Sequence, residues 1–197
     1  MPRTSARSHA RKARNQEPSS FIATAARSVL VTAGVAAIAN LGRKAMTQAP
    51  TAMARDWCEG LTREHEATLA AIDKLMATSA EHPQRRTMQL TAIKHMITKH
   101  ALQEENVIYP MIAREAADAT GELNKEHGEV KAMLFELTRM DKADPGFATT
   151  LAQLRSALEE HMREEEDELF PALRERLSDE ENRKLTRAMN MAGVMVA

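Results

Sequence analysis

The chain contains the same pattern twice, and this repeat constrains its fold more than any other feature of the sequence. Residues 100–110 read HALQEENVIYP and residues 161–171 read HMREEEDELFP, so that His, Glu, Glu, an aliphatic residue, an aromatic residue and Pro recur 61 positions later. A Glu-His pair lies upstream of each copy, ending at His65 and at His127. Imidazole and carboxylate groups at matching positions predict a symmetric metal site, and iron is the first metal to consider.

The composition favours a helical protein without a nucleic-acid partner. The net charge is −1, from 27 basic and 28 acidic residues, which gives no electrostatic case for nucleic-acid binding. Aromatic residues make up 3% of the chain, whereas β proteins depend on aromatic and β-branched residues. The single cysteine, Cys58, excludes an internal disulfide framework and a Cys-rich zinc site, and it suits a reducing compartment such as the cytoplasm.

The N-terminal region differs from the rest of the chain. Residues 1–20 are basic and poor in apolar residues, which predicts a disordered tail. Residues 21–50 are predicted to form an accessory apolar helix, and the 15-residue uncharged run at 28–42 is shorter than the roughly 20 residues of a membrane span. We favour a cytoplasmic protein; membrane-surface contact through 21–46 and an export signal are the alternatives.

From residue 51 onward the hydrophobic periodicity is helical throughout. It predicts helices over about 51–79, 84–117, 122–141 and 145–177, and a short fifth helix that begins with a capping box at Ser178 and ends in a tail at 197. Four long amphipathic helices with short connections predict an all-α, antiparallel up-down four-helix bundle over 51–177. Pro110 and Pro171 each remove one backbone hydrogen bond and should kink or end regular helix.

Each of the four helices places one histidine on its apolar face. His100 and Glu104 lie on the stripe that continues through Ile93, Ile97 and Ile108, and the fourth helix repeats this arrangement. No inward Lys or Arg is expected on helices one, two or four, and Lys131 is the only nearby candidate on the third. Because buried carboxylates need a compensating positive charge, a pair of metal ions is predicted. The candidate ligands are His65, His100, Glu104, His127, His161 and Glu165.

Other polar residues receive simpler interpretations. His9, His82 and His95 lie off the apolar stripes and are predicted not to be ligands. Glu105 and Glu166 are predicted to lie at the rim and to orient ligand histidines. Tyr109 could donate to the site, but a packed aromatic at its rim is the favoured interpretation.

These residues resemble the hemerythrin-like HHE cation-binding domain over about 55–177, in the subgroup with the order His, His-x-x-x-Glu, His, His-x-x-x-Glu. The resemblance implies a non-heme diiron centre, oxo- or hydroxo-bridged, with Glu104 and Glu165 as bridges. Oxygen-carrying hemerythrins have a further histidine where this chain has Lys131, and His-x-x-x-x-Asp in place of His161 and Glu165. Fewer histidines leave more room for water or peroxide, which argues against simple reversible oxygen carriage.

Three functions follow as alternatives. The first is a binding protein that senses or sequesters iron or a small oxygen species such as dioxygen or peroxide. The second is a diiron enzyme that consumes hydrogen peroxide, because open coordination positions are what metal-based redox chemistry needs. The third is a metal-stapled interaction module. The sequence indicates no catalytic side chain and no organic cofactor.

Overall fold

The computed structural model describes residues 54–196, which are helical with no strand. The predicted tail at 1–20 and accessory helix at 21–50 lie outside the described residues. The all-α fold class is confirmed over the described part of the chain. The elements are α2 (Trp57–Met76), α3 (Pro83–Gln103), η1 (Glu104–Ile108), α4 (Tyr109–Ile112), α5 (Ala117–Arg139), α6 (Pro145–Glu164), η2 (Glu165–Leu169), α7 (Phe170–Arg176) and α8 (Asp179–Val196), where η denotes a π-helical turn.

Local sequence signals set the helix boundaries. Asp56 caps α2 by accepting a hydrogen bond from the backbone N–H of Glu59. Asp144 caps α6 in the same way, with Pro145 at its first position. Before α8, Ser178 and Glu181 form the predicted capping box, because each side chain accepts a hydrogen bond from the other residue's backbone N–H.

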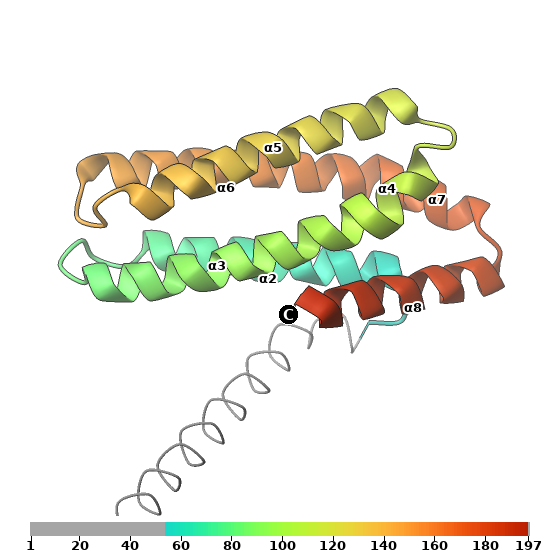
Figure 1. The fold of residues 1–197 in the computed structure, drawn as a ribbon, viewed down its shortest axis with the longest axis horizontal. Coiled ribbons are helices and arrows are strands. Elements are labelled where there is room, and N and C mark those ends of the chain that lie inside the picture. The colour runs from blue at the N-terminus through green and yellow to red at the C-terminus, as the bar shows by residue number, and fades with distance from the viewer. Residues whose placement is uncertain (1–53, 197) are drawn as a thin grey trace, which may run out of the picture. The chain divides into compact units, whose positions relative to one another are not determined.

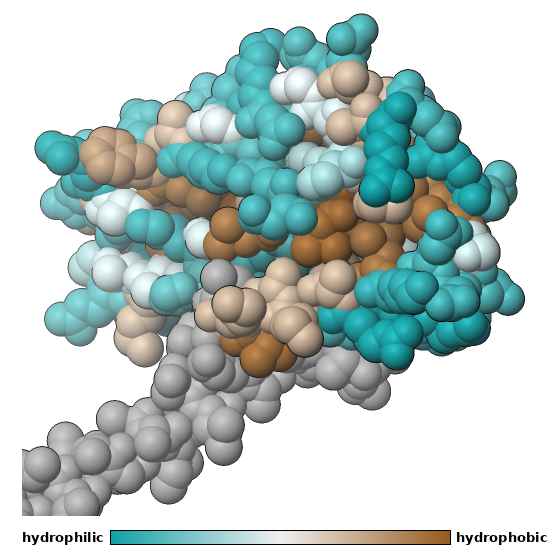
Figure 2. All heavy atoms as spheres, turned by 45° about the vertical axis from the view of Figure 1, so that its right-hand side comes forward, coloured by the Kyte–Doolittle hydropathy of each residue, from teal (hydrophilic) through white to brown (hydrophobic). Residues whose placement is uncertain are grey.

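Four long helices, α2, α3, α5 and α6, lie side by side, and the chain reverses direction at the short connections that follow α2 and α5 (Figure 1). On the face shown in Figure 2, hydrophilic residues surround smaller hydrophobic areas, and the apolar side chains of the long helices are buried in two clusters. Each helix therefore turns its apolar stripe toward its neighbours. None of the described helices is long and apolar enough to cross a membrane.

The apolar core consists of two clusters, and the histidines lie between them along the chain. In α2, Leu61 belongs to one cluster and Ile72 to the other, with His65 between them. In α5, Leu123 and Val130 flank His127 in the same way. The bundle therefore encloses a polar layer between two apolar ones, and the histidines of that layer are buried.

The two prolines of the repeat are accommodated by π-helical turns, which sequence reasoning did not specify. The predicted helices 84–117 and 145–177 are each divided, by η1 and by η2. The N–H of Tyr109 donates to the carbonyl of Glu104, and that of Phe170 to Glu165, five residues back in each case. A widened turn places Pro110 and Pro171 in the first turn of a new helix, where a missing N–H costs little. Glu104 and Glu165 are the first residues of these turns.

Helix α8 is a longer element than the predicted short fifth helix, and it contributes to the core. It has 18 residues, and Met189 is fully buried. Trp57 donates its indole N–H to Asn182 Oδ1 at 2.9 Å and its backbone N–H to Thr186 Oγ1 at 3.0 Å. The start of α2 is thereby fixed against α8, which runs alongside α2 and α3 (Figure 1).

Candidate metal centre

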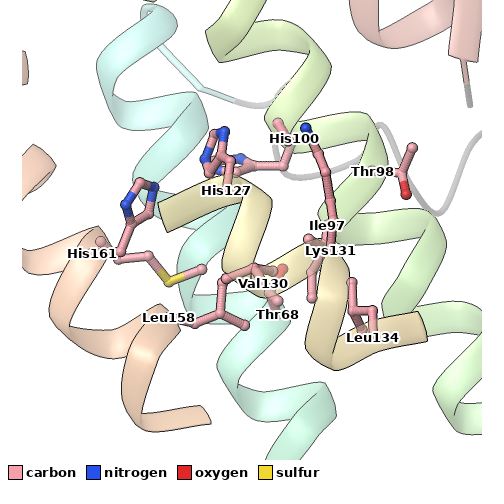
Figure 3. A pocket seen from close by; sticks show the side chains of 12 residues that line it. Thr68, Ile97, Thr98, His100, His127, Val130, Lys131, Leu134, Leu158 and His161 are labelled. Atoms are coloured by element: carbon pink, nitrogen blue, oxygen red, sulfur yellow. The ribbon is translucent and has the colours of Figure 1, made fainter. Parts of the chain in front are cut away.

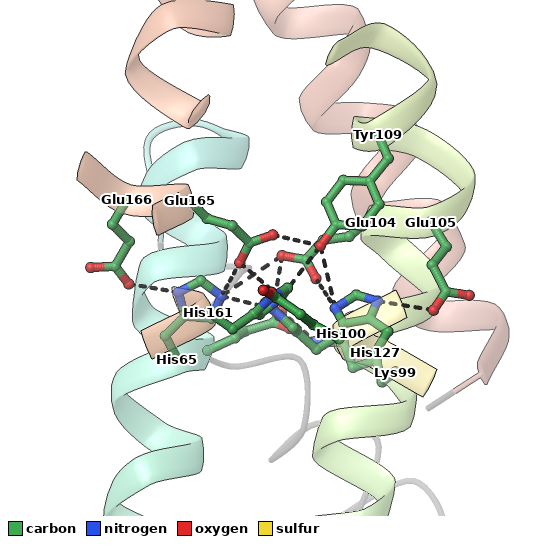
Figure 4. A network of polar contacts seen from close by, with 12 residues as sticks. His65, Lys99, His100, Glu104, Glu105, Tyr109, His127, His161, Glu165 and Glu166 are labelled. Carbon is green, nitrogen blue, oxygen red and sulfur yellow. Dashed lines mark hydrogen bonds and ion pairs between the residues drawn. The ribbon is translucent and has the colours of Figure 1, made fainter. Parts of the chain in front are cut away.

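The structure brings all six predicted ligand residues together in the polar layer of the bundle (Figure 4). They form two groups whose potential ligand atoms lie within 4.8 Å of one another. Every one of these side chains is buried, and Glu104 and Glu165 are fully so. Glu104 belongs to both groups, so its carboxylate faces histidines of each. One group holds His65, His100, Glu104 and Glu165, and the other holds Glu104, His127 and His161.

The imidazole Nε2 atoms point inward toward the carboxylates. His100 Nε2 lies 2.8 Å from both His65 Nε2 and Glu104 Oε1. Glu104 Oε2 lies 3.4 Å from His127 Nε2. Glu165 Oε2 lies 3.5 Å from the Nε2 atoms of both His65 and His161, so it too faces rings of both groups.

A second carboxylate faces the outward Nδ1 atom of every one of these histidines. On the first two helices, Glu166 Oε1 lies 2.6 Å from His65 Nδ1, and Glu64 Oε2 lies 3.3 Å from His100 Nδ1. On the other two, Glu105 Oε1 lies 2.9 Å from His127 Nδ1, and Glu126 Oε2 lies 2.6 Å from His161 Nδ1. A carboxylate at Nδ1 holds the proton there and leaves the Nε2 lone pair free. All four rings are therefore prepared as donors through Nε2.

The outer carboxylates follow the internal repeat. Glu64 and Glu126 each precede one histidine of the set and contact the histidine of the next long helix, whereas Glu105 and Glu166 follow the repeated His-Glu unit. The contacts predicted for Glu105 and Glu166 are present. Sequence reasoning missed Glu64 and Glu126, although the repeated Glu-His pair was the signal that could have identified them.

The carboxylates of Glu104 and Glu165 lack hydrogen-bond donors for most of their oxygens. Both oxygens of Glu104, and Oε2 of Glu165, have no hydrogen-bond partner among the residues that the structure describes. His100 Nε2 approaches Glu104 Oε1 to 2.8 Å, which is ion-pair distance. Unsatisfied buried carboxylate oxygens are costly, and a cation between them removes that cost.

Neighbouring carboxylates shift the pKa values of two buried groups in the layer, Glu165 and His100. Burial and the adjacent Glu104 carboxylate raise the pKa of Glu165 well above its ordinary value. Burial opposes protonation of His100, but the carboxylates of Glu104 and Glu64 outweigh it and raise the pKa of His100 to about 10. Around Glu104 the direction is opposite: burial raises the pKa of this carboxyl, but the facing histidines, His100 first, outweigh it and hold the pKa well below its ordinary value.

The expectation that no lysine points inward from the first, second or fourth helix is wrong. Lys99 on α3 is 2% exposed, and its Nζ lies 2.5 Å from Glu64 Oε1. It compensates an outer carboxylate, whereas the orphaned oxygens belong to Glu104 and Glu165. Lys131, the candidate on the third helix, is half-exposed and pairs with Glu105 at 2.6 Å. The long alkyl chain of Lys99 lets its charge reach Glu64 from a position off the apolar stripe.

Tyr109 is also placed differently from the favoured prediction. It is 2% exposed, and its hydroxyl donates to Glu165 Oε1 at 2.6 Å, inside the ligand set instead of at its rim (Figure 4). Burial and the charges of Glu104 and Glu165 raise the pKa of Tyr109 far above its ordinary value. The π-helical turn before it turns the ring inward, which the helical periodicity could not show. His82 and His95, by contrast, are exposed and lie apart from the cluster, as predicted.

A small pocket adjoins the centre. It has a volume of about 30 Å³, enough for a water-sized molecule, and His100, His127 and His161 lie at one end of it (Figure 3). Leu134 and Leu158 contribute apolar walls. The exposed residues Thr98 and Lys131 also line it, so the pocket reaches the surface between α3 and α5.

Comparison with known proteins decides the family. The sequence matches the hemerythrin HHE cation-binding domain over residues 59–173, which includes all six candidate ligands. The chain belongs to this family. The family's name describes cation binding, and the buried His/Glu groups of the described residues have the composition to hold metal.

Two curated relatives match parts of this hemerythrin-like chain. One is a protein named DNA nickase from Nostoc sp., 33% identical over 100 residues, which are 50% of this chain and 28% of that protein. The other is an uncharacterized hemerythrin-like protein of Schizosaccharomyces pombe, 31% identical over 90 residues, which are 44% of each chain. The alignments cover less than half of either relative. No solved structure matches significantly.

Proposed function

We propose that this hemerythrin-like protein holds a pair of iron ions between its four long helices and binds small oxygen species there, as a sensor or a store. The observation that carries the proposal is a set of three buried carboxylate oxygens without a hydrogen-bond partner among the described residues, both from Glu104 and one from Glu165, beside four inward-facing imidazole nitrogens. Two ions with a shared carboxylate would satisfy these oxygens and neutralise the buried charge.

The donor set fits iron. Imidazole together with carboxylate suits iron, manganese or zinc, and the mixed set of nitrogen and oxygen donors accepts both common oxidation states of iron. His65, His100, Glu104 and Glu165 would hold one ion, and Glu104, His127 and His161 the other. When bound, the metal pair supplies exchangeable positions and reversible one-electron chemistry. The protein holds the Nε2 donors in place, excludes bulk water and limits access to the 30 Å³ pocket.

The pocket supports a second candidate, an enzyme that consumes hydrogen peroxide. A cavity of about 30 Å³ beside three histidines suits molecules as small as dioxygen or peroxide. Lys131 and Glu105, at and beside the pocket, form a charged pair that could carry protons to His127 Nδ1. The DNA nickase activity in the name of the Nostoc protein does not extend to this chain by similarity, because the aligned segment is only 28% of that protein.

Metal stoichiometry combined with a peroxide assay tests both candidates. Glu104→Ala and Glu165→Ala should each lower bound iron sharply, whereas Glu168→Ala, in the exposed part of η2, should retain it. Full iron content in both site variants would contradict the assignment of the carboxylates. Oxygen release from peroxide by the iron-loaded protein would support the enzyme, and its absence would support the sensor or store.

A further inference from the structure

The aromatic residues that flank the two halves of the centre differ by one hydroxyl group. The repeat aligns Tyr109 with Phe170, and each ring stacks on one histidine of the set. Tyr109 lies 5.4 Å from His127 with an interplanar angle of 27°, and Phe170 lies 6.1 Å from His65 with an angle of 23°. The two aromatic rings thus occupy equivalent places, and only the one beside His127 carries an oxygen.

The Tyr109 hydroxyl lies within the donor group that has fewer members. Its Oη is 3.3 Å from His127 Nε2 and 3.4 Å from His161 Nε2. It is also 2.6 Å from Glu165 Oε1, the oxygen of that carboxylate that has a donor. The group of Glu104, His127 and His161 has three donors against four in the other group, and Oη supplies a fourth.

We propose that Tyr109 Oη is a ligand of the metal ion held by Glu104, His127 and His161. This inference rests on the proposed metal pair and defines the chemistry of its second position. Both positions then have four protein donors, two imidazoles and two oxygens, but only one of them includes a phenolate. On binding, the phenol O–H bond breaks, the proton leaves to solvent, and the oxygen lone pair bonds to the metal without any change in oxidation state.

A phenolate in one position makes the two ions unequal. An anionic oxygen donor stabilises the more highly charged ion, so ferric iron is favoured beside His127 and His161 relative to the other position. Lys131 pairs with Glu105, the carboxylate that contacts the outward Nδ1 atom of His127. Position 131 carries a lysine and supplies no ligand atom in this proposal. Tyr109 supplies the additional donor from inside the bundle.

The test is the visible and resonance Raman spectrum of the full chain loaded with ferric iron. Tyr109 is the single tyrosine of the chain, so any tyrosinate-to-iron charge-transfer band belongs to it. We expect such a band, with ring modes that shift when the protein is produced with ring-deuterated tyrosine. Iron-loaded protein that shows neither the band nor these modes would overturn the proposal while leaving the metal pair intact.

Variants separate this inference from the proposed function. Tyr109→Phe should lose the band and retain close to the wild-type iron content, because six ligands remain; Trp57→Phe, at the neighbouring apolar cluster, should retain both. A band that persists in Tyr109→Phe would overturn the assignment. Absence of iron from the wild-type protein under the same loading conditions would instead refute the proposed function.

Discussion

Replacing Glu165 with glutamine should stabilise the metal-free protein while weakening metal binding. Glu165 is fully buried, and its Oε2 has no hydrogen-bond partner among the described residues. Glutamine has nearly the same shape, keeps an oxygen to accept from the Tyr109 hydroxyl, and gains an amide N–H₂ that can donate to the orphaned oxygens of Glu104. The substitution removes an ionisable group beside the buried Glu104 carboxylate, so that the two side chains can no longer both carry negative charge.

The two effects have opposite signs and measurable sizes. Relieving a buried, unpaired charge should raise the unfolding free energy of the metal-free protein by about 1–3 kcal/mol, or roughly 2–12 °C in Tm for a chain of this size. If metal at a hundredfold excess over Kd stabilises the wild type by about 2.7 kcal/mol, a hundredfold loss of affinity leaves about 0.4 kcal/mol. The variant should therefore be more stable than wild type without metal and should gain little from metal.

The gain also depends on pH. Because the pKa of Glu165 is raised in the folded state, its contribution to stability is complete below the unfolded value of 4.5 and is lost as pH rises toward the folded value. The stability difference between Glu165→Gln and wild type should thus be small near pH 4 and grow as pH rises above 4.5. The stability difference grows with pH because the pKa of the Glu165 carboxyl is higher in the folded protein than in the unfolded chain.

Urea unfolding of metal-free and metal-loaded protein across this pH range measures both effects. Glu168→Gln is the matched control, since it removes the same charge from an exposed position in the same π-helical turn and should change stability by less than about 0.5 kcal/mol. A metal-free Glu165→Gln protein that is less stable than wild type at neutral pH, or that retains full metal affinity, would refute the reasoning.

Three further predictions concern the surroundings of the centre. Glu126→Gln should lower metal affinity about 10- to 100-fold in a chelator competition, because it weakens the contact to His161 Nδ1, whereas Glu129→Gln on the exposed side of the same helix should not. Trp57→Phe should cost more than about 1 kcal/mol in urea unfolding, because it removes the hydrogen bond to Asn182 and leaves space at a fully buried position; adding Asn182→Ala should cost less than the sum of the single changes. Lys131→His should alter the ligand-field spectrum of the metal-loaded protein, since position 131 lines the pocket beside the site; an unchanged spectrum would count against its placement there.

The sequence was sufficient to identify the inward residues because apolar periodicity and the repeat report the same face of each helix. His65, His100, His127 and His161 all lie between core residues, and each is buried as predicted. The periodicity also predicted the helices, but with boundaries that ignored the π-helical turns. Those turns arise from the prolines, whose effect on the preceding carbonyl is local and does not alter the hydrophobic pattern.

Contacts between helices could not be predicted in this way. Glu64 and Glu126 lie beside inward histidines in sequence, yet each contacts a histidine of another helix, which depends on how the helices pack. Lys99 is buried through its pairing with Glu64, although its position is off the apolar stripe. The inward orientation of Tyr109 depends on the widened turn before it. Periodicity specifies the face of a helix and not its partner.

The most direct test of the central claim is the metal content of anaerobically purified protein, measured together with its optical spectrum on exposure to air and then to peroxide. The account predicts about two irons per chain, from the two donor groups that share Glu104, and ferric bands of an oxo-bridged pair after oxidation. Protein that binds no iron when supplied with it, or that holds a single zinc ion, would contradict the account.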